Sequence, residues 1–302
     1  MVHDDVNSAI DLIPEWMPID AEMRQKIPLV WTRLLGTPGF NADVIEDLNG
    51  KPGDRLLGLG MAIVLNSTWL ERLRVSPPEN TAIELYRELI SGTYSLPTDR
   101  ELAVANAKGQ VSFFVLHYSQ KLRDPSDPDT LNMYAIGMSL FHTSHVGYRL
   151  SELYQEALDE EGKHLMNMGF KCFTKHENPS CSKLYGLNSK VAFDMFPGNI
   201  ISHVFLFTPP KMGFSHSERK LLRLATNDFS DDQIADELGL TLHTVKKLWR
   251  SIHSRSSECM PDLFQHMTDL PSGTRGPDRR RILLKYLRQH LEELRPFRLM
   301  QK

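Results

Sequence analysis

Hydrophobic positions in the first two hundred residues form two patterns, short unbroken apolar runs and longer stretches with helical spacing. The apolar run at residues 56–65 and the aromatic and β-branched run at 111–118 predict buried strands. Helical spacing predicts helices at residues 28–35, 81–89, 131–145 and 148–168. Three more strands are expected, at residues 170–173, 191–196 and 201–207. Strands that alternate with helices indicate an α/β or α+β sheet layer covered by helices.

The pattern changes after residue 210, where three short amphipathic segments follow one another, each with a capping residue in front. Ser215, with Glu218 three residues later, forms a capping box that starts the first helix, and Arg219 is expected on the solvent side of that helix. Ser230 caps the second helix and Thr241 the third, because their hydroxyls can accept from free amides of the first turn. Gly239 ends the second helix, since it has no Cβ to clash in a left-handed cap. The spacing predicts two helices joined by a tight turn, with a third helix before them.

The last of these three helices carries its charges on one side. Val245, Trp249 and Ile252 face inward, and no acidic residue lies between Thr241 and Arg255. A helix that enters the major groove of DNA needs donors for phosphate oxygens and base edges, and phosphates would repel acidic groups there. Taken alone, however, such a face is also typical of the solvated side of an amphipathic helix. Its place in a helix-turn-helix pattern is what favours DNA.

That pattern resembles a known family. The sequences FSHSE at 214–218, SDDQIA at 230–235 and TVK at 244–246 resemble the LuxR/GerE-type helix-turn-helix of bacterial transcription regulators. The resemblance covers at most the last third of the chain, and its spacing is kept without gaps from Ser215 to Ile252. Three positions depart from the family: Asp228 replaces a usual glycine, Gln233 a usual glutamate and Ser256 a common apolar residue. The resemblance implies a DNA-binding module that acts on transcription.

By analogy with docked helix-turn-helix proteins, the N-terminal part of the third helix reads base edges, and later cations contact phosphate. The expected base-reading residues are Thr241, His243, Thr244 and Lys247. The expected phosphate contacts are Lys246, Arg250 and Arg255. Because one short helix reads only a few base pairs of double-stranded DNA, we expect a homodimer.

Charge divides the chain at the same place. Residues 1–210 hold 18 Lys and Arg against 26 Asp and Glu, a net of −8, and residues 211–302 hold 17 against 12, a net of +5. Pro209 and Pro210 mark a boundary. We therefore expect an α/β or α+β sensory or interaction domain at 1–210, an all-α LuxR-like helix-turn-helix domain at 211–270 and an amphipathic helical extension at 271–302. The extension would dock by its apolar face on the sensory domain or on a second subunit, or add phosphate contacts through its arginines.

Other features argue mainly against alternatives. No apolar run reaches the roughly 20 residues that cross a bilayer, and the start of the chain has no signal-peptide pattern, so we expect a cytoplasmic protein without membrane contact. Cys172, His176 and Cys181 could bind zinc only with a further ligand, and Cys172 is more typical of a small core side chain. His142 and His145 lie one turn apart, and we expect a structural or solvent-facing pair. Neither a metal nor a cofactor is expected.

These observations together predict a transcription regulator, not an enzyme, in which a small molecule or protein signals through the N-terminal domain. Its order of elements is compatible with a GAF- or PAS-like sensor or with an acyltransferase-like sheet. The alternative function is a small-molecule (acyl) transferase with an appended helix-turn-helix, although only Gly147 stands where such enzymes have a glycine-rich phosphate loop. A protein-interaction adaptor that does not bind DNA is the other alternative.

Overall fold

The computed structural model describes residues 1–51, 54–124, 126–174, 178, 181–195, 200–267 and 275–298. A six-stranded mixed sheet with the order β1-β2-β3-β4-β6-β5 lies at its centre. Its strands are β1 (Phe40–Glu46), β2 (Leu56–Val64), β3 (Val111–Gln120), β4 (Leu150–Ala157), β5 (Lys171–Cys172) and β6 (Lys183–Asn188). Neighbouring strands run antiparallel except for β3 and β4, which run parallel.

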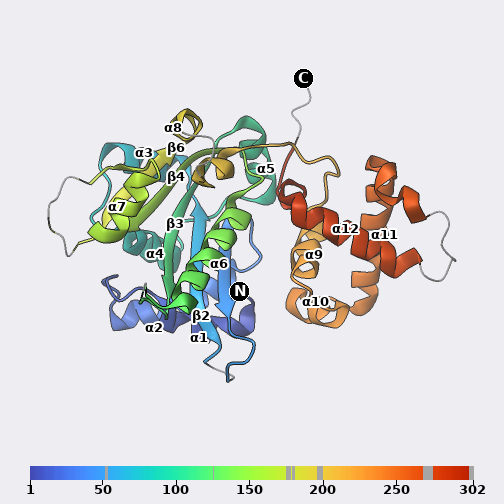
Figure 1. The fold of residues 1–302 in the computed structure, drawn as a ribbon, viewed down its shortest axis with the longest axis horizontal. Coiled ribbons are helices and arrows are strands. Elements are labelled where there is room, and N and C mark those ends of the chain that lie inside the picture. Colours follow the sequence, from blue (N-terminus) through green and yellow to red (C-terminus); the bar gives the residue numbers. More distant parts are fainter. Residues whose placement is uncertain are drawn as a thin grey trace.

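Helices cover both faces of this sheet (Figure 1). The first face packs against α1 (Val6–Ala9), α2 (Ala21–Leu34), α3 (Ser67–Val75) and α4 (Thr81–Ser91). The second face packs against α5 (Asp99–Lys108), α6 (Pro128–His145), α7 (Asp159–Asn167), α8 (Ser189–Asp194) and the 3₁₀ helix η3 (Ile200–Phe205). Because strand side chains alternate, Phe114 and Leu116 of β3 enter the first core, and Phe113 and Val115 enter the second.

Four more helices follow residue 210 and share a third apolar cluster. They are α9 (His216–Thr226), α10 (Asp231–Leu238), α11 (Leu242–Cys259) and α12 (Arg275–Gln289), with 3₁₀ helices η4 (Pro261–Met267) and η5 (Leu291–Leu294). The predicted caps are confirmed: the side chains of Ser215, Ser230 and Thr241 each accept a hydrogen bond from the amide three residues later. Gly239 ends α10 with a φ of 62°.

The expectation of a distinct all-α C-terminal domain is wrong. The chain forms one mixed sheet with helices throughout, and the helices after residue 210 are bonded to those that cover the sheet. Arg219 of α9, which the sequence placed on the solvent side, is only 7 % exposed and pairs with Asp99 at the start of α5. The buried Asn106 of α5 donates from Nδ2 to the carbonyl oxygen of Pro296 at 2.8 Å. The domain boundaries expected at residues 210 and 270 remain predictions.

Several expected elements are also corrected. Residues 148–168 do not form one helix but contain β4 followed by α7, and residues 191–196 fall mainly in helix α8 rather than in a strand. Residues 201–207 fall mostly in η3, and only two residues of the expected strand at 170–173 pair as β5. β4 lacks an alternating pattern because Leu153 and Tyr154, on opposite faces, are both buried. Among the described residues, no helix has the length and apolar character that a membrane span requires.

Candidate functional site

Helix α11 is fixed at its start by the turn that follows α10. Gly239 adopts the left-handed backbone conformation, and Thr241 then accepts at Oγ1 from the amide of Thr244 at 3.2 Å. The hydroxyls of these two threonines also lie 2.9 Å apart. Both hydroxyls therefore serve the cap of α11, although Thr241 stays exposed and Thr244 half-buried.

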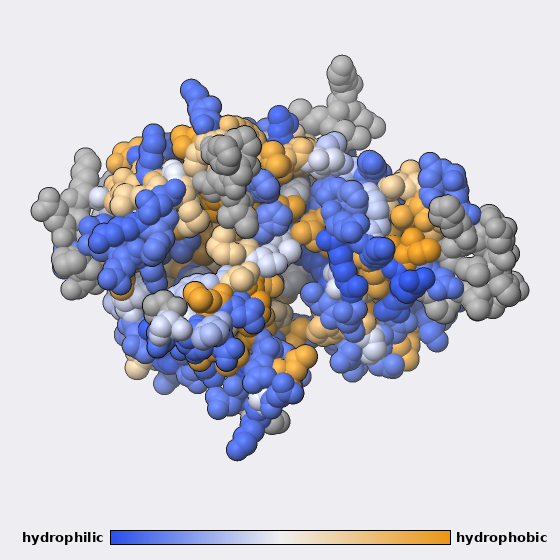
Figure 2. Space-filling model, in the orientation of Figure 1, coloured by the Kyte–Doolittle hydropathy of each residue, from blue (hydrophilic) through white to orange (hydrophobic). Residues whose placement is uncertain are grey.

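The remaining predicted contact residues lie mainly on one exposed face of α11. His243, Lys246, Lys247 and Arg250 are exposed, while the opposite side of the helix is buried in the third apolar cluster. Within the part of the chain that the structure describes, no ion pair involves Lys246, Lys247 or Arg250. α11 lies on the side of α9 and α12 that faces away from the sheet (Figure 1). The surface over these helices is mostly hydrophilic, with a few hydrophobic residues between (Figure 2).

Arg255 differs from the other predicted cations because it is engaged within the protein. Its Nε lies 3.3 Å from the carboxylate of Glu218 in α9. Burial would raise the pKa of Glu218, but hydrogen bonds from Ser215 and Ser251 and the charge of Arg255 outweigh it and lower that pKa. Arg255 thus joins α11 to α9, and only part of its charge is available to an outside phosphate.

The three departures from the LuxR/GerE pattern each have a local explanation. Asp228 has a φ of 63°, the left-handed conformation that a glycine adopts most easily. Gln233 completes the capping box in place of glutamate, because its Oε1 accepts from the amide of Ser230 at 2.9 Å. Ser256 is fully buried, and its hydroxyl donates to the carbonyl oxygen of Ile252 at 2.8 Å. The turn and caps of the pattern are therefore kept despite the changed residues.

Arginines of α12, which the sequence offered as additional phosphate contacts, are partly engaged in the protein. Arg280 pairs with Asp231 at 2.7 Å and lies over the ring of Trp249, 4.3 Å from its centre. Arg288 pairs with Asp228 at 2.5 Å. The apolar side of α12 packs on the other C-terminal helices, since its buried leucines belong to the same cluster.

A second candidate site is a cavity of about 690 Å³ at the point where β3 and β4 separate. The two strands pair as far as Val115 and Gln155, and both of these residues line the cavity. Beyond this point β3 continues beside β2 to Gln120, and β4 continues beside β6 to Ala157. Helices α6 and α7 contribute the other walls. A parting of two parallel strands therefore creates the space.

One end of this large cavity is polar and buried in part. Asp43 of β1 accepts a hydrogen bond from the hydroxyl of Ser144, and Asn41 donates to the carbonyl oxygen of Ser144 at 3.0 Å. His145, 2 % exposed, has its Nδ1 2.7 Å from the carbonyl oxygen of Phe141. Burial lowers the pKa of His145 to about 4. The ring is therefore neutral near pH 7.

The other charged residues of the large cavity come from α7 and from the loop before α6. Glu160, Glu161 and His164 of α7 line it together with Arg123. Burial raises the pKa of Glu161, while the charge of Arg123 acts in the opposite direction. Sequence reasoning missed these residues, because they come from segments whose proximity depends on the sheet.

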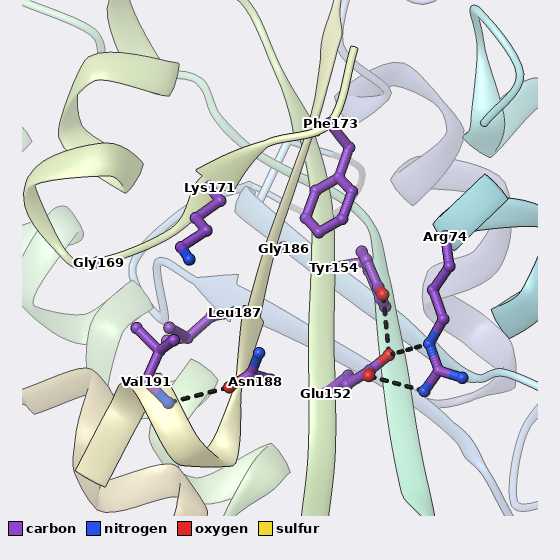
Figure 3. Close-up of a pocket in the computed structure, with 10 residues that line it drawn as sticks. All are labelled: Arg74, Glu152, Tyr154, Gly169, Lys171, Phe173, Gly186, Leu187, Asn188 and Val191. Carbon is purple, nitrogen blue, oxygen red and sulfur yellow. Dashed lines mark hydrogen bonds and ion pairs between the residues drawn. The ribbon is translucent and has the colours of Figure 1, made fainter. Parts of the chain in front are cut away.

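A smaller cavity of about 210 Å³ lies beside strands β4, β5 and β6, next to α3 (Figure 3). Arg74 of α3 donates to the carboxylate of Glu152 at 2.7 Å, and Tyr154 donates to the same carboxylate at 2.8 Å. Hydrogen bonding to Glu152 raises the pKa of Arg74. Lys171 and Phe173 complete the lining. Its main charges compensate one another, and its volume is below the roughly 300–1,000 Å³ of most small-molecule sites. The large cavity is the stronger candidate.

The sequence also singled out cysteines and histidines. Cys172 is exposed in β5, so the expectation of a core side chain is wrong, and His176 lies outside the described residues. Of the expected structural or solvent-facing pair, His145 is buried and His142 is half-buried. In the described ranges, no group of histidine, cysteine and carboxylate side chains could hold a metal ion.

Comparisons with known proteins assign no family to the chain. No family model matches it, and no curated protein matches it. Among solved structures it is similar to FeeM, an N-acyl amino acid synthase from uncultured soil microbes, with 9 % identity and a TM-score of 0.34. That likeness covers 63 % of this chain and 85 % of FeeM. At this level of similarity it supports no functional argument.

Proposed function

We propose that this protein binds double-stranded DNA through α11 and regulates transcription. The observation that carries the proposal is the exposed face of α11, on which Lys246, Lys247 and Arg250 stand together without an ion pair to any described residue. Three exposed cations on one helix create a local positive potential, which favours the binding of phosphate groups. The helix follows a capped turn, so its N-terminal end is held rigidly by the helix before it.

The roles of the individual side chains follow from their positions. Thr241, His243, Thr244 and Lys247 lie toward the N-terminal half of α11, the end that reads bases in docked helix-turn-helix proteins. Lys246 and Arg250 would contact phosphate, with Arg255 a weaker contributor because it is paired with Glu218. Two copies of the chain would read the two halves of a pseudo-palindromic site.

Fluorescence anisotropy of selected DNA fragments at several salt concentrations tests this function. Lys246→Ala and Arg250→Ala should each weaken binding to all sequences and reduce the slope of log affinity against log salt by about 1. Lys247→Ala and His243→Ala should change which sequence is preferred. Lys108→Ala, which removes an exposed cation of α5, is the matched control and should bind as the wild type does. Equal binding by all five variants and the wild type would exclude the role of α11.

One observation favours a second function, a small-molecule (acyl) transferase. The large cavity is adjacent to several titratable groups, which an enzyme could use for proton transfer. An acyl transfer from a thioester to an amine would release a free thiol, which a chromogenic thiol reagent detects. Thiol release from acyl-coenzyme A that requires both the protein and an added amine would support this function. No release above the rate without protein, over a panel of amino acids, would exclude acyl-coenzyme A as a donor.

A further inference from the structure

The large cavity between β3 and β4 has a chemical character that the proposed DNA contact does not explain. We infer that it binds an amphipathic organic amine, a molecule with an apolar body and a protonated N–H head group. Three properties of the cavity support this ligand class: its apolar walls, its excess of carboxylates and an unpaired buried hydrogen-bond acceptor.

The walls are suited to an apolar body. Phe141, Leu165, Phe170 and Ile201 line the cavity from the second face of the sheet. The volume of about 690 Å³ falls within the roughly 300–1,000 Å³ of typical small-molecule sites. Transfer of apolar surface from water to such walls contributes about 25 cal/mol per Å² before the costs of binding.

The charges at the cavity favour a cation. Asp43, Glu160 and Glu161 line it, against the guanidinium of Arg123, and Arg295 acts on Asp43 from outside the lining. Three carboxylates still exceed these two guanidinium groups. Asp43 belongs to β1 and the two glutamates to α7, so carboxylates contribute from two different parts of the lining. A ligand carboxylate or phosphate would add negative charge to this excess, whereas an ammonium group would reduce it.

His145 provides the hydrogen-bond acceptor. A carbonyl oxygen can only accept, so the contact with Phe141 places the ring proton on Nδ1 and leaves Nε2 as a bare acceptor. Nε2 is buried and has no hydrogen-bond partner among the described residues. Because Nε2 has almost no accessible surface, a ligand N–H reaches it only when the ring or a neighbouring side chain shifts. A buried acceptor without a donor is costly, so that contact would then gain more free energy than a solvent-exposed hydrogen bond. A fatty acid anion or a quaternary ammonium ion carries no N–H to donate.

Isothermal titration calorimetry of the full chain with four probes of equal chain length tests the inference. Octylammonium carries both the charge and the N–H donors, octyltrimethylammonium only the charge, octan-1-ol only a donor, and octanoate the opposite charge. Octylammonium should bind most tightly, with an advantage of about tenfold or more over octanoate and about threefold or more over octyltrimethylammonium. Octanoate or octanol binding as tightly as octylammonium would overturn the inference.

Variants show whether binding occurs in this cavity. Glu161→Gln, which keeps the size of the side chain and removes its charge, should weaken octylammonium binding by about threefold while leaving octanol binding unchanged. Met138→Trp should narrow the cavity and weaken octylammonium binding, and His145→Phe should remove the advantage over octyltrimethylammonium. Glu71→Gln removes an exposed carboxylate of α3 outside the cavity and should bind all four probes as the wild type does. Octylammonium binding that is insensitive to Met138→Trp and Glu161→Gln would place the amine elsewhere and refute the inference, whatever the DNA experiments give.

Discussion

Arg295 donates from Nε to the carbonyl oxygen of Val146 at 2.8 Å, and so joins the end of the C-terminal helices to the residue after α6. The same guanidinium donates to the carbonyl oxygen of Thr143 and lies over the ring of Tyr148, 4.8 Å from its centre. Burial lowers the pKa of Arg295. Main-chain carbonyls and an aromatic ring therefore compensate a buried charge.

Loss of Arg295 should destabilise the whole protein. Arg295→Ala removes two hydrogen bonds to carbonyls and the packing on Tyr148, and we expect the free energy of unfolding to fall by about 2 kcal/mol or more. Urea unfolding followed by tryptophan fluorescence measures the change. Arg298→Ala is the control, since Arg298 is exposed, and it should lie within about 0.5 kcal/mol of the wild type. A similar small change for Arg295→Ala would mean that this contact does not stabilise the fold.

Gly147 and Gly213 form a matched pair for a second prediction. Both have a positive φ, 87° and 58°, but a Cβ on Gly147 would lie 2.6 Å from the Cα of Glu292, whereas one on Gly213 would meet nothing within 4 Å. Gly213→Ala should lower the free energy of unfolding by about 1 kcal/mol through backbone strain alone. Gly147→Ala should lower it by at least about 1 kcal/mol more, because its Cβ would also clash with Glu292. Thermal unfolding of both variants checks the order, and equal costs would show that the contact with Glu292 yields easily.

Asp228 allows a test of the turn before α10. An alanine in the left-handed conformation costs about 1–2 kcal/mol, whereas asparagine tolerates it better. Asp228→Ala should therefore be less stable than Asp228→Asn by about 1 kcal/mol, and the comparison is matched because both remove the ion pair with Arg288. Equal unfolding midpoints in urea for the two variants would contradict a strained turn.

Arg255 and Arg250 should differ in their effect on DNA affinity. The pairing of Arg255 with Glu218 leaves less of its charge for phosphate, so Arg255→Ala should weaken DNA binding less than Arg250→Ala does. Arg255→Ala should lower stability instead, because it leaves the buried Glu218 without its cation. Anisotropy titrations and urea unfolding of both variants separate these effects. A larger loss of DNA affinity for Arg255→Ala would reverse the assignment.

His145 should make stability depend on pH on the acid side. Its pKa is about 4 in the folded protein, below the ordinary value of 6.5, so between these values the unfolded chain binds a proton that the folded protein does not. Stability should fall as the pH decreases from about 6.5 to about 4, by on the order of 3 kcal/mol for this group. His145→Phe should flatten the fall. The buried His117 acts in the same direction, since burial lowers its pKa to about 3.

Local signals predicted the C-terminal helices well. Capping depends on residues only three positions apart, so Ser215, Ser230 and Thr241 could be identified from the sequence alone. β4 was assigned to a helix because its buried residues on both faces also fit helical spacing. The strand expected at residues 191–196 is helix α8, and its start was signalled by Asn188, whose side chain accepts from the amide of Val191.

The large cavity could not be predicted in the same way. Its carboxylates come from β1 and α7, and it lies where the ladder of β3 and β4 ends, at Val115 and Gln155. Hydrophobic patterns describe which face a strand buries but not where two strands stop pairing. The position of Arg219 was wrong for a related reason, since its partner Asp99 is 120 residues away.

The side chain of Asn106 is hydrogen-bonded to a residue that lies 190 positions later in the chain. Its Nδ2 donates to the carbonyl oxygen of Pro296, and its Oδ1 accepts from the amide of Arg149 at 2.7 Å. α5 therefore acquires this partner only after Pro296 has been synthesised. A chain that stopped before Pro296 would leave the buried Nδ2 of Asn106 without this acceptor, so we expect such a truncation to lower the stability of the fold.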